Sequence, residues 1–162
     1  MLPDWLGGDG PTVGGDPLVG TDYGRACEMD DYVGLVDVGP GQGLVLGDEP
    51  APTTWWPLPH TGGGILIRWL GAESEEEVIT ALEQLAEPGW QLTGIMIDVP
   101  SGKLVLFDSA YRGNETDRLM RDEHRQALTI DIGVGAYGVE TVEYEPDPDT
   151  VLLLHRLVPS RI

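Results

Sequence analysis

Two sets of carboxylates in this sequence have spacings that hydrolytic chemistry could use. Asp98 and Asp108 stand at the ends of two predicted strands that flank the turn Val99-Pro100-Ser101-Gly102. Paired across such a hairpin, the two carboxylates could act as acid and base. Because carboxylates are common throughout this chain, we favour the alternative that both are strand-end residues facing water.

The second set, Glu145-x-Asp147-x-Asp149, spaces its carboxylates as a calcium-binding loop does. An EF-hand also requires glycine at the sixth loop position and glutamate at the twelfth, where this chain has Thr150 and Arg156. We therefore interpret the segment as an acidic turn. A metal-dependent or acid/base hydrolase that uses Asp98, Asp108 or the 145–149 carboxylates remains the alternative function.

The remaining residues of catalytic type give weaker signals. His60, His124 and His155 have no histidine or cysteine partner at ligand spacing, so no metal site is predicted. Cys27 could be a nucleophile beside one of them, but a lone cysteine is more often a small buried apolar residue. Gly133-x-Gly135-x-x-Gly138 is followed by alternating β-branched residues where a dinucleotide site needs a helix, so it indicates a turn and no cofactor is expected.

The elements that must position these residues are mostly short strands. Runs rich in apolar and β-branched residues lie at 33–38, 43–46, 65–70, 92–98, 103–108, 128–132, 137–144 and 151–157. The last run is apolar on both faces, which predicts a central strand. One main helix is predicted at about 75–87, with Ser74 as N-cap, Glu77 at capping-box spacing and Pro88-Gly89 as its stop. This pattern predicts an α+β fold: a mostly antiparallel β-sheet of about eight strands with one main helix packed on it.

The chain length predicts a single domain over residues 1–162. Within it, the glycine- and proline-rich residues 1–21 are expected to form a loosely ordered N-terminal segment. No apolar run approaches the roughly 20 residues of a transmembrane helix. Cys27 is the only cysteine, so the sequence predicts no internal disulfide and favours the cytoplasm.

Charge is the most unusual property of the chain. Twenty-eight acids face nine bases, a formal net charge of −19. This excess disfavours nucleic acid and anionic membranes as partners and favours a basic protein. Residues 131–149 contain six acids and no base. We predict an acidic binding patch there, with a merely solvated face as the alternative. Its members are Glu140, Glu143, Glu145, Asp147 and Asp149, joined by Asp30, Asp31, Asp48 and Glu49.

Trp55 and Trp56 form the second predicted binding feature. They lie in the proline-rich segment 48–59, which is predicted to be a rigid loop. Neighbouring residues of an extended segment point in opposite directions, so we expect one Trp to pack on the sheet and the other to be an exposed binding anchor.

A series of short motifs runs from Asp22 toward the C-terminus. They are Asp22-Tyr23-x-Arg25-Ala26-Cys27, Asp31-Tyr32-x-Gly34-Leu35, Leu46-Gly47-Asp48-Glu49-Pro50 with Thr53-Thr54-Trp55, Arg68-Trp69, Leu106-Phe107-Asp108-Ser109-Ala110 and Tyr144-x-Pro146-Asp147-x-x-Thr150. Together they resemble the immunity protein 21 family of bacterial polymorphic toxin systems. The resemblance implies neutralisation of a cognate toxin by binding, and it implies no catalytic residues. It also implies an apolar β-segment ahead of Asp22. This chain begins Met1-Leu2-Pro3, which leaves open a missing first strand or a misassigned start.

Binding and catalysis are therefore the competing classes of function. We favour an immunity protein that binds its toxin through an acidic surface, without catalysis, metal or cofactor. The charge favours a basic toxin such as a nuclease, because an acidic inhibitor can imitate the charge of a nucleic acid. The hydrolase described above is the alternative, and an interaction module within a larger assembly is a third possibility.

Overall fold

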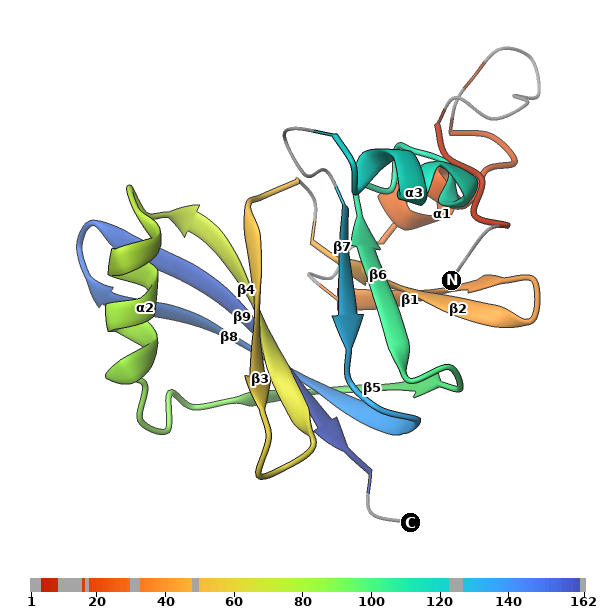
Figure 1. Ribbon diagram of the computed structural model, residues 1–162. Coiled ribbons are helices and arrows are strands. Elements are labelled where there is room, and N and C mark those ends of the chain that lie inside the picture. Colours follow the sequence, from red (N-terminus) through yellow and green to blue (C-terminus); the bar gives the residue numbers. More distant parts are fainter. Residues whose placement is uncertain are drawn as a thin grey trace. The chain divides into compact units, whose positions relative to one another are not determined.

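The computed structural model describes residues 4–8, 16, 18–29, 33–47, 50–122 and 127–160. Their elements are α1 (Asp22–Cys27), β1 (Val33–Val38), β2 (Gly41–Leu46), β3 (Thr53–Leu58), β4 (Gly63–Gly71), α2 (Glu75–Glu83), β5 (Gln91–Val99), β6 (Lys103–Phe107), a 3-10 turn (Gly113–Glu115), α3 (Thr116–Leu119), β7 (Ala127–Asp131), β8 (Gly135–Asp147) and β9 (Thr150–Pro159) (Figure 1). Within the described residues, nine strands thus form three sheets, accompanied by a few short helices. The predicted α+β class is confirmed.

The chain forms two compact units, each built from two separate stretches of sequence. Unit 1 comprises Met1–Glu49 and Asp98–Val134, and unit 2 comprises Pro50–Ile97 and Gly135–Ile162. Whether both units fold together as the single expected domain stays a prediction. No helix among the described residues has the length and apolar character needed to cross a membrane.

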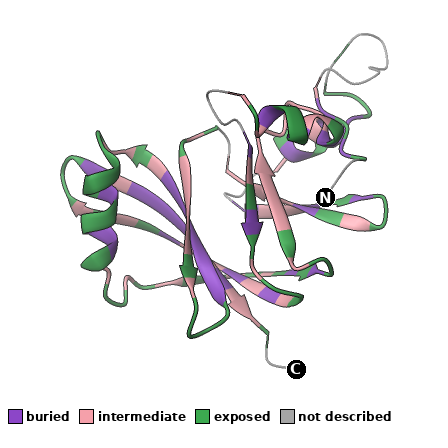
Figure 2. Ribbon diagram, viewed as in Figure 1, coloured by how far each residue is buried: buried purple, intermediate pink, exposed green. Residues whose placement is uncertain are grey.

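Unit 2 is organised around a five-stranded sheet with the order β3-β4-β9-β8-β5. The pairs β3–β4, β4–β9 and β8–β9 are antiparallel. β9 lies between β4 and β8, and Leu152 and Leu153, which point to opposite faces, are both buried. Figure 2 shows the middle of this sheet as the most continuously buried part of the unit. The central strand predicted from two apolar faces is therefore confirmed.

Helix α2 begins where the sequence predicts. The Ser74 side-chain oxygen accepts the backbone N–H of Glu77 at 3.3 Å, as an N-cap does. The Glu77 carboxylate in turn accepts the N–H of Glu73 at 2.9 Å, one residue before the position a capping box uses. The helix ends at Glu83, earlier than the predicted 87, because the N–H of Leu85 bonds to the carbonyl of Leu82 and tightens the last turn.

The buried face of α2 lies on the sheet of unit 2. Val78, Ala81 and Leu82 pack against sheet residues. The buried sheet residues of this core are Ile65, Ile67, Val142, Leu152 and Leu154. The hydroxyl of Tyr144 on β8 also donates to the carbonyl of Ala81, at 3.4 Å. The predicted amphipathic stripe thus fixes the helix to one face of the sheet.

The structure corrects the prediction for segment 48–59. Thr53–Leu58 is strand β3, paired antiparallel with β4, and not a rigid loop. Threonine and tryptophan favour strands, and β3 is an edge strand, where Pro57 is tolerated because an outward-facing N–H is not needed. The prolines of segment 48–59 suggested a loop, but they do not prevent an edge strand from forming there.

Unit 1 contains two two-stranded sheets, β1–β2 and β6–β7. The first is the predicted hairpin, which turns at Gly39 with a positive φ of 54°. The second overturns the hairpin predicted across Val99–Gly102: β6 pairs with β7, whereas β5 belongs to the sheet of unit 2. The physical reason is that the carbonyl of Gly102 accepts the N–H groups of Ile132 and Gly133, so the turn directs β6 toward β7.

Unit 1 contains a small hydrophobic core. Trp5 is 4% exposed, its ring meets that of Phe107 edge-to-face at 6.2 Å, and its Nε1 donates to the carbonyl of Ser109 at 2.8 Å. Ala26 and Val36 complete the contact between α1 and the β1–β2 hairpin. Residues near the start of the chain are thus part of this core.

Candidate partner-binding surface

Four of the predicted acidic residues lie together on the hairpin that joins β8 and β9. Glu143, Glu145, Asp147 and Asp149 are all exposed. The turn is tight: Asp147 pairs with Thr150, and the N–H of Asp149 donates to Asp147 Oδ1 at 3.0 Å. The carboxylates therefore project from a fixed backbone.

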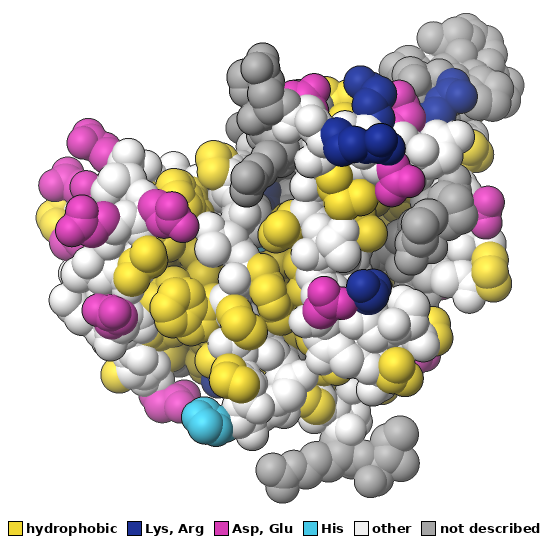
Figure 3. Space-filling view, in the orientation of Figure 1, with side chains coloured by type: hydrophobic (Ala, Val, Ile, Leu, Met, Phe, Trp, Pro, Cys, Tyr) yellow, Lys and Arg dark blue, Asp and Glu magenta, His cyan; other side chains and the backbone are white. Residues whose placement is uncertain are grey.

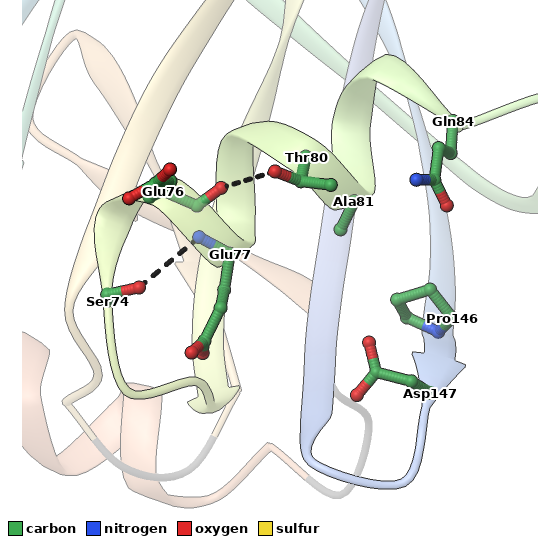
Figure 4. A pocket seen from close by; sticks show the side chains of 8 residues that line it. All are labelled: Ser74, Glu76, Glu77, Thr80, Ala81, Gln84, Pro146 and Asp147. Atoms are coloured by element: carbon green, nitrogen blue, oxygen red, sulfur yellow. Dashed lines mark hydrogen bonds between the residues drawn. The ribbon is translucent and has the colours of Figure 1, made fainter.

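The hairpin borders the first turns of α2 and forms a groove with it. Its lining residues are Ser74, Glu76, Glu77, Thr80, Ala81, Gln84, Pro146 and Asp147 (Figure 4). Figure 4 shows Asp147 on the hairpin side of the groove and the helix residues opposite it. Sequence reasoning assigned Glu77 to helix capping and missed this role in the surface. The run of glutamates at 75–77 could have indicated an acidic surface, but only the fold places this run beside the hairpin.

Glu140 does not belong to the uncompensated patch that the sequence predicts. It faces Arg156 across the β8–β9 ladder, and Arg156 Nε donates to Glu140 Oε2 at 2.7 Å. A second guanidinium nitrogen of Arg156 pairs with the same carboxylate. The side chain of Arg156 is only 26% exposed and that of Glu140 only 17%. The segment 131–149 contains no base, but Arg156 reaches Glu140 from the neighbouring strand β9. Asp131 is likewise paired, with Lys103 at 3.2 Å.

The two adjacent tryptophans point in opposite directions, as the strand geometry requires. Trp56 packs against the core beneath α2. Trp55 lies over Gly64, where an added Cβ would collide with the indole ring. Both are half-buried, so neither projects freely from a loop. The use of either one as a binding anchor stays a prediction.

Helix α2 leaves part of its sheet face open. Trp56, Leu58 and Trp90 pack against the core beneath it, but each remains only half-buried. At the edge of this core, one cross-strand row carries Trp56, Ile65, Arg156 and Glu140 in register; Ile65 is buried, and the other three are half-buried. The guanidinium carbon of Arg156 lies 4.3 Å from the centre of the Trp90 ring.

Two further apolar side chains extend this open region. Leu58 is two residues from Trp56 and packs, half-buried, against the same core. Met96 on β5 is 46% exposed and lies beside Gly138, two residues from Glu140 on β8. We call the set formed by Trp56, Leu58, Trp90, Met96 and the Glu140–Arg156 pair the aromatic face. Figure 3 shows hydrophobic side chains in a broad field beside the acidic side chains over α2.

The hairpin that would pair the two carboxylates of the alternative hydrolase is not formed. Asp98 lies on β5 and Asp108 follows β6, and these strands belong to different sheets. Asp108 Oδ1 accepts the N–H of Ala110 at 2.9 Å, a local turn contact. Among the described residues, no group of three or more His, Cys, Asp or Glu side chains could hold a metal ion.

His155 and Cys27 lie in opposite environments. His155 is fully buried, with Nδ1 3.2 Å from Thr141 Oγ1, and burial together with the charge of Arg68 lowers its pKa to about 4. Cys27 is exposed at the end of α1, so the expectation of a small buried cysteine is wrong. A hydrogen bond with Cys27 raises the pKa of the Tyr23 hydroxyl, one helical turn away.

The other predicted acids, Asp30, Asp31, Asp48 and Glu49, lie outside the described residues. The described part of the candidate surface is therefore the acidic groove and hairpin together with the aromatic face, all within unit 2.

Comparison with known proteins gives one family. A family model described as Immunity protein 21 matches residues 1–150. The match begins ahead of the motifs seen in the sequence and ends at the first residue of β9. No curated protein and no solved structure matches the chain.

Proposed function

Because the chain belongs to the immunity protein 21 family, we propose that it neutralises a cognate toxin of a bacterial polymorphic toxin system by binding it directly through an acidic surface. The observation that carries this proposal is the meeting of two acidic segments at one groove. Asp147 of the hairpin and Glu76 and Glu77 of α2 line it together. Such one-sign clustering speeds the encounter with a cationic partner.

The charge inventory of unit 2 supports a basic toxin. Residues 50–97 and 135–162 contain eleven acids and three bases. Of these bases, Arg156 is committed to Glu140 and Arg68 is 6% exposed. The exposed carboxylates of the hairpin and α2 thus leave a strong negative field, which a nuclease with a phosphate-binding surface would complement. Nucleic acid and anionic membranes carry the wrong charge.

In this proposal the chain acts by occupying the toxin's surface, so it involves no catalytic step, metal or cofactor. We place this action in the cytoplasm. The exposed thiol of Cys27 suits a reducing compartment.

Co-expression with the toxin domain encoded directly upstream tests the proposal. We expect the toxin alone to arrest growth, the chain to restore it, and the two proteins to co-elute as a complex. The toxin domain of an unrelated gene pair serves as the control and should remain toxic. Growth arrest in the presence of the folded chain, with no complex formed, would contradict the proposal.

A further inference from the structure

The aromatic face of unit 2 is an apolar surface that the unit's own helix leaves open. We propose that it is the docking surface for the toxin, and that the toxin presents to it an apolar segment flanked by arginine or lysine side chains. This inference rests on the proposed function and adds to it the location of the interface and the chemistry of the bound segment.

The composition and rigidity of the aromatic face support this role. Tryptophan and arginine are the residue types that dominate binding energy at protein interfaces. Trp56 is held by strand pairing with Ile65, and Trp90 is held against the Arg156 guanidinium at 4.3 Å. Both anchors are ordered before a partner arrives, which lowers the entropy lost on binding.

The cation in the middle of this face, Arg156, is half-buried and already neutralised. Arg156 is bound by Glu140 through two guanidinium nitrogens, so it does not repel a basic partner. The apolar centre can therefore meet apolar side chains while positive charge on the partner is directed to the edges.

The edges of the aromatic face are acidic. By helical spacing, Glu75 and Ile79 occupy the flank of α2 opposite most of the groove-lining residues, and Glu75 is exposed. Glu87 is also exposed, three residues before Trp90. Arginine or lysine side chains beside the docked segment would meet these carboxylates.

Charge also decides between possible occupants. A second copy of this chain would bring the same acids against these acids, and a net charge of −19 opposes such self-association. A basic protein gains from the same field. The apolar centre with an acidic rim therefore fits the toxin and not another copy.

Binding kinetics against the purified toxin domain encoded upstream test the docking surface. Trp90 lies outside the helices and strands, so Trp90→Ala is the main variant, and Trp56→Phe is a milder second one. We expect Trp90→Ala to raise Kd on the order of 30-fold, mainly through faster dissociation. Val134→Ser is the control, because Val134 is 75% exposed and belongs to unit 1. It should bind like the wild type.

Hydroxyl-radical footprinting of the wild-type chain gives a readout that does not depend on variant folding. We expect the toxin to reduce oxidation of Trp56, Trp90 and Met96. If the toxin binds, but these residues stay unprotected and Trp90→Ala binds normally, the interface lies elsewhere and the proposed function still stands. If the toxin does not bind the wild type at all, the proposed function fails as well. Protection in the chain alone as its concentration rises would identify a second copy as the occupant and overturn the inference.

Discussion

Removing three carboxylates from the β8–β9 hairpin should slow toxin binding without loosening the bound complex. The change is Glu143→Gln, Glu145→Gln and Asp149→Asn, which leaves the turn-forming Asp147 side chain in place. Glu140 is not included, because Arg156 already pairs with it. Exposed charges at the edge of an interface act mainly on the rate of association.

The size of the effect follows from the number of charges and the salt concentration. A carboxylate about 6 Å from a partner cation in water is worth about 0.7 kcal/mol before screening, and three are worth about 2 kcal/mol. With a Debye length of about 30 Å at 0.01 M salt and about 8 Å at 0.15 M, screening leaves about 1.7 and about 1 kcal/mol. Association should therefore slow about 20-fold in low salt and about 5-fold at 0.15 M.

The assay is surface binding kinetics against the toxin domain encoded upstream, at both salt concentrations. A matched control removes three exposed acids from unit 1 by Glu28→Gln, Asp37→Asn and Asp117→Asn. If this control slows association as much as the hairpin variant, net charge matters and the hairpin has no special role. If the hairpin variant associates at the wild-type rate in low salt, its acids form only a solvated surface.

Three predictions concern stability. The pKa of His155 is about 4 in the folded chain against 6.5 for the unfolded one, so the unfolded state takes up the proton first as pH falls. The wild type should lose about 2–3 kcal/mol of unfolding free energy between pH 7 and 4.5 relative to His155→Gln, as measured by urea unfolding at both pH values. Raising salt from a low concentration to about 0.15 M should raise the melting temperature, because it screens the repulsion among acids; a fall would mean that favourable ion pairs outweigh that repulsion. Thermal unfolding followed by circular dichroism and by calorimetry should show one cooperative transition, because each unit is assembled from two separate stretches of chain. Two resolved transitions would show that the units unfold independently.

Local sequence patterns determined most of the secondary structure. Alternating apolar residues located the strands, and Ser74 located the start of α2, because side-chain alternation and N-capping depend on residues only a few positions apart. The two apolar faces of 151–157 even placed β9 at the centre of its sheet. The motifs spread along the chain were also enough to indicate the family that the comparison confirms.

The composition of the surface depended on contacts that no local pattern contains. Arg156 neutralises Glu140 from 16 positions away, and β6 pairs with β7 and not with β5, its neighbour in sequence. The glutamates of α2 meet Asp147 only because the buried face of the helix fixes it beside the hairpin. Strand register and helix packing are chosen by the burial of the whole core, so they bring together charges and rings from distant segments. The sequence by itself therefore determined most of the elements, the acidity and the family of this protein, whereas tertiary structure decided which acids of the β8–β9 hairpin remain exposed and which aromatic rings remain only half-buried.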